Sequence, residues 1–111
     1  MSSNYVPDRG DAIWIDFNPQ LGHEQRGRRP ALVLSHRSYN ERVGLALLCP
    51  ITSKIKNHPF EVQIATEKLT GAILSDQIKS LDWTVRSTEF IEKLDPTVLN
   101  QVLERIEVLI N

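Results

Sequence analysis

The stretch Leu45-Ala46-Leu47-Leu48-Cys49-Pro50-Ile51 is a nearly unbroken apolar run in the middle of the chain. A short apolar run of this kind is typical of a strand that is buried on both faces. We therefore predict a central β-strand over residues 45–51. Cys49 is the single cysteine of the chain, so it has no internal disulfide partner, and we expect a buried, unreactive thiol.

The residues on both sides of this run carry the patterns of further strands. Residues 10–17 alternate between apolar and polar side chains, and Pro30 opens a second apolar segment at a position where a missing N–H is tolerated. Alternation and short apolar segments indicate the remaining strands. The expected strands besides 45–51 cover residues 10–17, 31–34, 60–64, 72–74, 78–81 and 85–91, and a short helix is expected over residues 37–43.

The last part of the chain has a helical period instead. Asp95 suits the N-cap of a helix and Pro96 suits its first position. Apolar residues then recur with the spacing of one helix face, from Val98 to Ile110. We predict an amphipathic helix that packs on an antiparallel barrel or half-barrel, a mainly β fold.

Composition and charge restrict the class of protein. The length of 111 residues suits one domain, so we take residues 1–111 as a single domain. Residues 20–58 carry seven Lys or Arg, two acidic residues and all three histidines, although the net charge of the chain is only −1. Such a positive face binds phosphate, although clustered but merely solvated charges would give the same count. Because we find no membrane span and no signal peptide, we expect a cytoplasmic protein.

Two polar loops carry the chemistry that we single out. Residues 22–30, GHEQRGRRP, combine an imidazole, a carboxylate and three guanidiniums, and a second loop begins at Thr52. If the strands over residues 31–34 and 45–51 are direct antiparallel neighbours, Arg29 and Thr52 lie at the same edge of the sheet. Asp76 and Gln77 interrupt a later apolar stretch and are expected to reach the same region.

At these residues the chain resembles the MazF/PemK/Kid family of toxin endoribonucleases, and the resemblance covers nearly the whole sequence. The pattern G-H-E-Q-x-x-x-R-P followed by P-x-T is specific at this spacing. The motifs that carry the resemblance are Arg9-Gly10-Asp11, Ile13-Trp14, Phe17-Asn18-Pro19, Gly22-His23-Glu24-Gln25, Arg29-Pro30, Ala31-Leu32-Val33-Leu34-Ser35, Pro50-Ile51-Thr52-Ser53 and Asp76-Gln77.

The resemblance implies a toxin of a type II toxin–antitoxin system with an SH3-like barrel and a C-terminal helix. It implies a homodimer that cleaves single-stranded RNA without a metal or other cofactor. The ribose 2′-hydroxyl is the implied nucleophile, and a cyclic phosphate and a 5′-hydroxyl are the implied products. The implied partners are an acidic antitoxin and, for the toxin–antitoxin complex, DNA.

The resemblance also assigns catalytic roles to five residues. Arg29 and Thr52 match the main catalytic pair of the family, and Glu24 matches a position implicated in activity. His23 and Asp76 match positions that have acid–base roles in some members. The chain has Leu74 where those members have an arginine, which puts an acid–base role of Asp76 in doubt.

We expect a second group of residues to bind the RNA. These are Asp16, Phe17, Asn18, Gln25, Arg26, Arg28, Lys54, Lys56, Gln77 and Lys79. No His, Cys or carboxylate cluster has the spacing of metal ligands, so we expect no metal site. Trp14 and Trp83 are expected in the core, with an aromatic surface for bases or for a partner as the alternative.

The chemistry of Arg29 suits a phosphate clamp better than a base, because a guanidinium stays protonated and its fork fits two phosphate oxygens. Thr52 suits donation of one hydroxyl hydrogen bond, and Glu24 or His23 suits the base. The structural alternatives are an Arg29–Glu24 ion pair and a turn capped by Thr52. The functional alternatives are a toxin of the same fold that binds a protein target such as gyrase, and a nucleic-acid-binding module without cleavage.

Overall fold

The computed structural model describes residues 4–18 and 27–111. The strands in these ranges are β1 (Asp11–Asp16), β2 (Arg28–Val33), β3 (Leu45–Thr52), β4 (Glu61–Ala65), β5 (Thr70–Leu74), β6 (Lys79–Asp82) and β7 (Glu89–Lys93). The helices are α1 (Arg37–Val43), the short 3₁₀ helix η3 (Trp83–Val85) and α2 (Pro96–Ile110).

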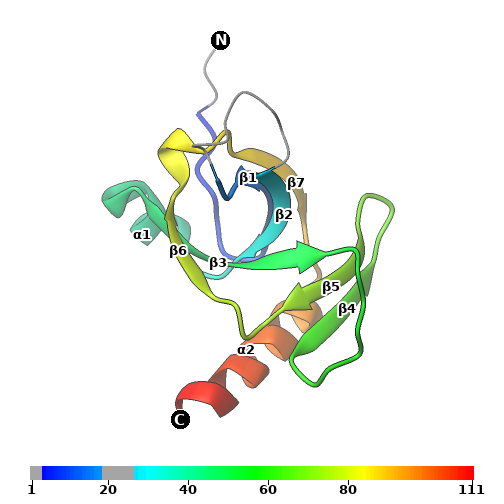
Figure 1. Cartoon of the computed structure of the whole chain (residues 1–111). Coiled ribbons are helices and arrows are strands. Elements are labelled where there is room, and N and C mark those ends of the chain that lie inside the picture. Colours follow the sequence, from blue (N-terminus) through cyan, green and yellow to red (C-terminus); the bar gives the residue numbers. More distant parts are fainter. Residues whose placement is uncertain (1–3, 19–26) are drawn as a thin grey trace.

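The strands form one curled sheet with β3 at its centre (Figure 1). The strand order is β4-β5-β3-β2-β1-β7, and the pairs of neighbouring strands are antiparallel. On the side of β3 away from β2, β6 pairs with the first half of the strand and β5 with its end. The predicted central strand is therefore confirmed, and its central place explains why both of its faces are apolar.

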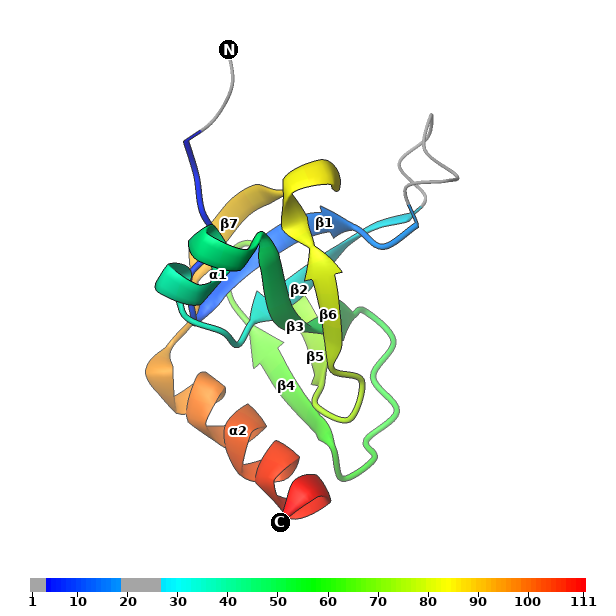
Figure 2. The same cartoon turned by 90° about the vertical axis from the view of Figure 1, so that its left-hand side faces the viewer.

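Side chains pack into two hydrophobic clusters on the two faces of this sheet. One cluster contains Leu32, Cys49 and Ile73, and the inner face of α2 packs against it through Val102 and Ile106. Figure 2 shows α2 lying along β4 at one end of the molecule. The other cluster is built on alternate residues of the central strands: Ile13, Ile15, Ala31, Val33 and Leu48. The predicted mainly β fold with a C-terminal helix is confirmed.

The two helices begin and end where the sequence indicates. The Asp95 side chain accepts a hydrogen bond from the backbone N–H of Thr97 at 2.9 Å, and Pro96 follows it at the start of α2. Helix α1 ends at Gly44, whose φ of 80° lies in the left-handed region that favours glycine. In the described part of the chain, no helix is long and apolar enough to cross a membrane.

Two predictions made from the sequence, for the strand over residues 85–91 and for Trp14, are wrong. The strand expected over residues 85–91 begins only at Glu89, because Asp82 accepts a hydrogen bond from the N–H of Thr84 at 2.9 Å and turns the chain into η3. Trp14 was expected in the core, but 36% of its surface is exposed. The prediction for Trp83 fits better, since its ring is half-buried and its indole N–H donates to the backbone oxygen of Asn40 at 2.9 Å.

Candidate active site

Arg29 and Thr52 lie at the same edge of the sheet. Strands β2 and β3 are direct antiparallel neighbours, with Ala31 opposite Pro50. Continuing this register by two residues brings Arg29 level with Thr52, and both residues line one open pocket. The geometric prediction made from the sequence is confirmed.

Three pockets meet around this pair. The Trp14 pocket has a volume of about 450 Å³ and is lined by Trp14, Arg29, Pro30, Ile51, Thr52, Ser53, Lys54, Leu69 and Thr70. The Phe17 pocket, of about 330 Å³, is lined by Phe17, Asn18, Arg29, Pro50, Gln77, Lys79 and Leu81. The His58 pocket, of about 200 Å³, is lined by Thr52, Lys54, Lys56, His58, Glu61, Leu74 and Gln77. The shared members, Arg29, Thr52, Lys54 and Gln77, connect the pockets around this edge of the sheet.

Arg29 stands between the Trp14 pocket and the Phe17 pocket and lines both. Its side chain is exposed, and within the described residues no carboxylate pairs with it. The ion pair with Glu24 that we considered from the sequence lies outside those residues. An exposed guanidinium at the junction of two pockets is well placed to hold a phosphate that bridges them.

The hydroxyl of Thr52 has a structural role as an acceptor, and its proton is available for one further hydrogen bond. Its oxygen accepts a hydrogen bond from the N–H of Lys54 at 3.1 Å, so Thr52 does cap a turn. Among the described residues no acceptor takes the hydroxyl proton, which can therefore be donated into the pocket. The two interpretations of Thr52 are compatible, because one hydroxyl both accepts and donates.

Six of the predicted RNA-binding residues line these pockets: Phe17, Asn18, Lys54, Lys56, Gln77 and Lys79. Asp16 instead accepts a hydrogen bond from the N–H of Asn18 at 2.9 Å and fixes the chain where it leaves β1. Asp76 is exposed and lines none of the three pockets as the described residues form them. The predicted residues His23, Glu24, Gln25 and Arg26 lie outside the described residues.

Arg28 differs from its neighbour Arg29 because consecutive residues of a strand point to opposite faces. Its guanidinium forms an ion pair with Glu89 on β7. The guanidinium carbon also lies 5.7 Å from the centre of the Trp14 ring, within the range of a cation–π contact. These partners hold the Arg28 side chain against the Trp14 ring, and Arg28 lines none of the three pockets.

Two further residues position the site, and the sequence analysis missed both. Glu61 is buried, and its carboxylate accepts hydrogen bonds from the N–H of Lys56 at 3.1 Å and of Asn57 at 2.9 Å. Arg86 donates to the backbone oxygens of Asp16 at 3.1 Å and of Phe17 at 3.2 Å. Glu61 thus holds the loop after β3, and Arg86 holds the end of β1.

Cys49 takes no part in this surface. It is buried, and its sulfur lies 4.0 Å from the backbone oxygen of Ser75. Burial, and secondarily the negative charge of Asp76, raises the pKa of its thiol to about 12. The prediction of a buried thiol is confirmed. Residues 4–18 and 27–111 contain no group of His, Cys, Asp or Glu side chains that is arranged to hold a metal ion.

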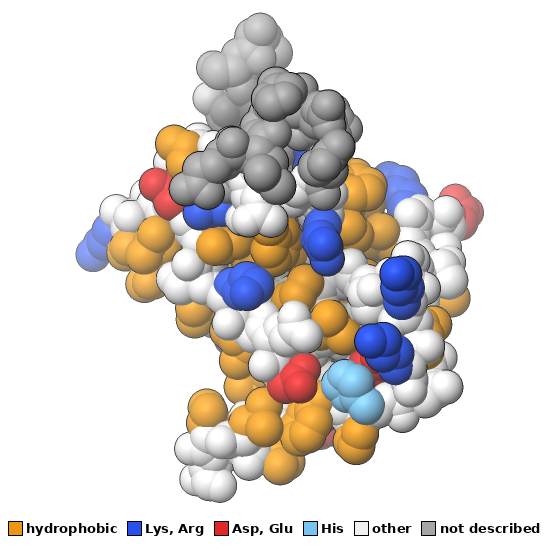
Figure 3. Space-filling model, in the orientation of Figure 1, with side chains coloured by type: hydrophobic (Ala, Val, Ile, Leu, Met, Phe, Trp, Pro, Cys, Tyr) orange, Lys and Arg blue, Asp and Glu red, His pale blue; other side chains and the backbone are white. Residues whose placement is uncertain are grey.

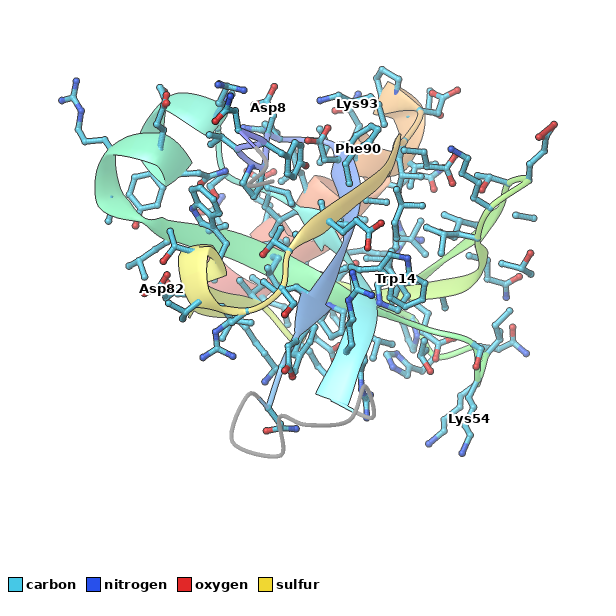
Figure 4. The ribbon with its side chains drawn as sticks, turned by 90° about the horizontal axis from the view of Figure 1, so that it is seen from above. Asp8, Trp14, Lys54, Asp82, Phe90 and Lys93 are labelled. Atoms are coloured by element: carbon cyan, nitrogen blue, oxygen red, sulfur yellow. The ribbon has the colours of Figure 1, made fainter. Side chains whose placement is uncertain are left out.

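Basic side chains are spread over the face of the molecule seen in Figure 1, with apolar surface between them (Figure 3). Figure 4 shows the labelled Trp14 and Lys54 toward one side of the molecule, apart from Asp8 and Lys93. Trp14 and Lys54 line the same pocket. Lys93, away from this pocket, forms ion pairs with Asp8 and Asp11. Among the described residues, Arg29, Lys54, Lys56 and Lys79 line the three pockets without an ion-pair partner, so this surface carries positive charge beside the aromatic side chains of Trp14 and Phe17.

The fold is that of a known class of small toxins. The chain belongs to the family of PemK-like, MazF-like toxins of type II toxin–antitoxin systems, whose family model matches residues 8–110. The resemblance found in the sequence is thereby confirmed.

Similar proteins match almost end to end. The endoribonuclease toxin MazF of Escherichia coli K12 is 44% identical over 110 residues, which is 99% of each chain. The solved structure of MazF from Deinococcus radiodurans has a TM-score of 0.86 at 45% identity and covers 96% of this chain and 97% of that one. A MazE–MazF complex from the same organism has a TM-score of 0.85 at 39% identity, with 96% of both chains covered.

Proposed function

We propose that the protein is the toxin of a type II toxin–antitoxin system, an endoribonuclease that cleaves single-stranded RNA at the surface around Arg29 and Thr52. The observation that carries this proposal is an exposed arginine between two pockets, next to a hydroxyl donor and with no ion-pair partner among residues 4–18 and 27–111. Relatives with the name endoribonuclease match over 93–99% of the chain, and this supports the same activity here.

The chemistry of the site fits internal attack by the ribose 2′-hydroxyl on the adjacent phosphate. The new O–P bond forms as the bond to the 5′-oxygen breaks, and the leaving 5′-oxygen takes up a proton from water, which leaves a 2′,3′-cyclic phosphate and a 5′-hydroxyl. Arg29 stabilises the negative charge that develops on the phosphorane oxygens, and Thr52 donates one hydrogen bond to them. Glu24 or His23 takes the proton of the 2′-hydroxyl, and Asp76, which lines none of the three pockets as the described residues form them, is a weaker candidate.

The same surface is the one to which we assign RNA binding. Lys54, Lys56 and Lys79 are exposed around the pockets and neutralise backbone phosphates. Phe17 offers an aromatic side chain to a base, and Asn18 and Gln77 offer amide groups that hydrogen-bond to base edges. The groups outside the described residues, Gln25 and Arg26, remain proposed RNA ligands on the loop between β1 and β2.

We further propose that the protein works as a homodimer in the cytoplasm and is inhibited by an acidic antitoxin that covers this basic surface. Charge complementarity favours such a partner. A solved MazE–MazF complex of a similar toxin supports an antitoxin partner. Light scattering at micromolar concentration tests the dimer, and a monomer there would contradict it.

Two properties of RNA cleavage test the enzymatic part of the proposal. Cleavage of a single-stranded RNA should continue in excess EDTA, because the proposed steps use no metal. A 2′-deoxy or 2′-O-methyl sugar at the cut position should abolish cleavage, because it removes the nucleophile. If the deoxy-substituted site were cut, water would be the attacking group. If no RNA were cut at all, a toxin that binds a protein target would be the better interpretation.

A further inference from the structure

The exposed ring of Trp14 is a feature that the proposed chemistry does not use. Trp14 lies on β1, with Pro30 of β2 and Glu89 of β7 opposite it on the two neighbouring strands. More than a third of its surface, 36%, is exposed, and it forms part of the wall of the Trp14 pocket. A large aromatic side chain at such a position is a candidate for contact with a ligand.

The ring is held in place from one side. Cross-strand neighbours share a face of the sheet, as do residues two apart on one strand, so Arg28 and Glu89 lie on the same face as Trp14. Arg28 covers the ring at 5.7 Å and is itself held by the Glu89 carboxylate. Because the charge of Arg28 is already paired, its role at this site is to support the ring.

The two pockets beside Arg29 lie on opposite faces of the sheet. In the Trp14 pocket, Trp14, Pro30 and Ile51 lie on one face of the sheet. Their neighbours along the strands point to the opposite face, which carries Phe17 and Leu81. Arg29, at the edge of the sheet, lines both pockets. Each pocket contains one partly exposed aromatic side chain, Trp14 in one and Phe17 in the other.

We propose that Trp14 stacks on the base of one of the two nucleotides that flank the cleaved phosphate; this rests on the proposed function. A phosphate held by Arg29 has one nucleoside on each side, and the structure offers one pocket on each side. The two volumes, about 450 and about 330 Å³, lie in the range of about 300–1,000 Å³ for small-ligand sites. Stacking on an aromatic ring accepts any base, so it supplies affinity and position without sequence preference.

The rest of the Trp14 pocket suits a nucleotide better than a protein side chain. Thr70 and Ser53 bring hydroxyl groups that can bond to a ribose, and Lys54 brings a positive charge for the next phosphate. The pocket also shares Arg29 and Thr52 with the proposed cleavage site, so its occupant lies directly against the reacting group. An antitoxin segment at Trp14 is the competing occupant, and the experiment separates the two.

The experiment begins with an RNA that the wild-type protein cuts and that carries a 2′-deoxy sugar at the mapped cut position. Binding of this uncleaved RNA is measured for the wild type, Trp14→Ala and Trp14→Phe. Trp14→Ala should weaken binding about 5- to 150-fold, the equivalent of about 1–3 kcal/mol for one stacked base. Trp14→Phe should retain most of the affinity. Tyr39→Ala, which removes an exposed aromatic ring from α1, is the matched control and should bind as the wild type does.

Abasic RNAs identify the contact. The same RNA is made with the base removed from the nucleotide on the 5′ side or on the 3′ side of the cleaved phosphate. At the side that Trp14 contacts, the abasic RNA should bind the wild type and Trp14→Ala equally weakly, because the stacking partner is already missing. At the other side, the effect of Trp14→Ala should persist.

A fluorescence measurement on the unchanged protein covers the case in which Trp14→Ala does not fold. 2-Aminopurine at the contacted position should lose fluorescence on binding, because stacking quenches it. If neither position is quenched, or if Trp14→Ala binds every RNA as the wild type does, the inference is overturned while RNA cleavage stands. A Trp14→Ala protein that loses only antitoxin affinity overturns it in favour of a protein contact. If the wild type cuts no RNA, the proposed function fails, and this inference fails with it.

Discussion

The backbone of Gly71 lies directly against the carbonyl group of Thr52. A Cβ atom at Gly71 would stand 2.1 Å from the Thr52 oxygen and 3.0 Å from its carbonyl carbon. Strand β5 approaches the end of β3 here, where Thr52 is paired with Ala72. The absence of a side chain at Gly71 therefore allows β5 to lie this close to the backbone of Thr52.

We expect Gly71→Ala to lower both stability and RNA cleavage. The methyl group must push β5 and Thr52 apart, and overpacking of this kind costs about 1–3 kcal/mol. Urea unfolding measures the first effect, and single-turnover cleavage by the folded protein measures the second. Gly44→Ala is the control, because its φ of 80° makes it costly by about 1–2 kcal/mol although its Cβ meets nothing nearer than 3.9 Å. It should lose stability alone; cleavage lost equally in both variants would contradict our account of Gly71.

The sequence predicts the pairing of Arg29 with Thr52 for a simple geometric reason. The two apolar runs on either side of residues 35–44 indicate two strands, and direct antiparallel pairing then fixes which of their ends meet. Arg29 and Thr52 are end residues of such strands, so the local pattern is sufficient. Helix α2 could be predicted for the same reason, because its N-cap residue and its helical spacing of apolar residues lie close together in the sequence.

Residues that depend on distant partners were not predictable in this way. Trp14 stands between Ile13 and Ile15 in the sequence, which favours a core position, and only the fold shows that its face of the sheet is partly open there. Arg86 bonds to the carbonyl of Asp16, which lies 70 residues earlier in the chain. In the sequence Glu61 is one polar residue of a predicted strand. Its role as the acceptor for the loop after β3 follows only from the folded structure, in which the N–H groups of that loop lie against its carboxylate.

Glu61→Ala should loosen the loop that carries Lys54 and Lys56. Removing the carboxylate leaves two loop N–H groups without their acceptor, which costs about 1–3 kcal/mol when such groups are buried. We expect weaker RNA binding together with faster hydrogen exchange at the amides of Lys56 and Asn57. Glu67→Ala removes an exposed carboxylate from the turn after β4 and should change neither quantity. Unchanged exchange in Glu61→Ala would show that the loop is held by other contacts.

Cys49 should be protected from alkylation for as long as the protein is folded. Since the thiolate is the reactive form and burial raises the thiol pKa to about 12, the thiol stays protonated at pH 8. Raising the pH from 8 to 10 should accelerate alkylation of the urea-unfolded chain, whose thiol has an ordinary pKa of about 8.5. The folded protein should remain slow over the same range. Equal rates for folded and unfolded protein at pH 8 would mean that the thiol is accessible.

The decisive variants for the mechanism are Arg29→Ala and Arg29→Lys. If Arg29 stabilises charge that develops on the phosphorane, its loss should slow cleavage far more than it weakens substrate binding. Loss of one preorganised donor typically costs about 10²–10³ in rate. Arg29→Lys keeps the charge but loses the fork, so it should recover only a small part of the rate.

The alternative for Arg29 is a structural ion pair with Glu24, and it predicts a different result. Arg29→Ala and Glu24→Ala would then lower the melting temperature by similar, small amounts, because an exposed pair is worth about 0–1 kcal/mol. Single-turnover cleavage of a short RNA by the folded protein separates the two cases. Arg42→Ala, which removes an exposed arginine from α1, controls for the loss of one positive charge and should cleave normally. A rate for Arg29→Ala within about threefold of the wild type would remove Arg29 from the mechanism, because a lost oxyanion-type donor costs about 10²-fold or more.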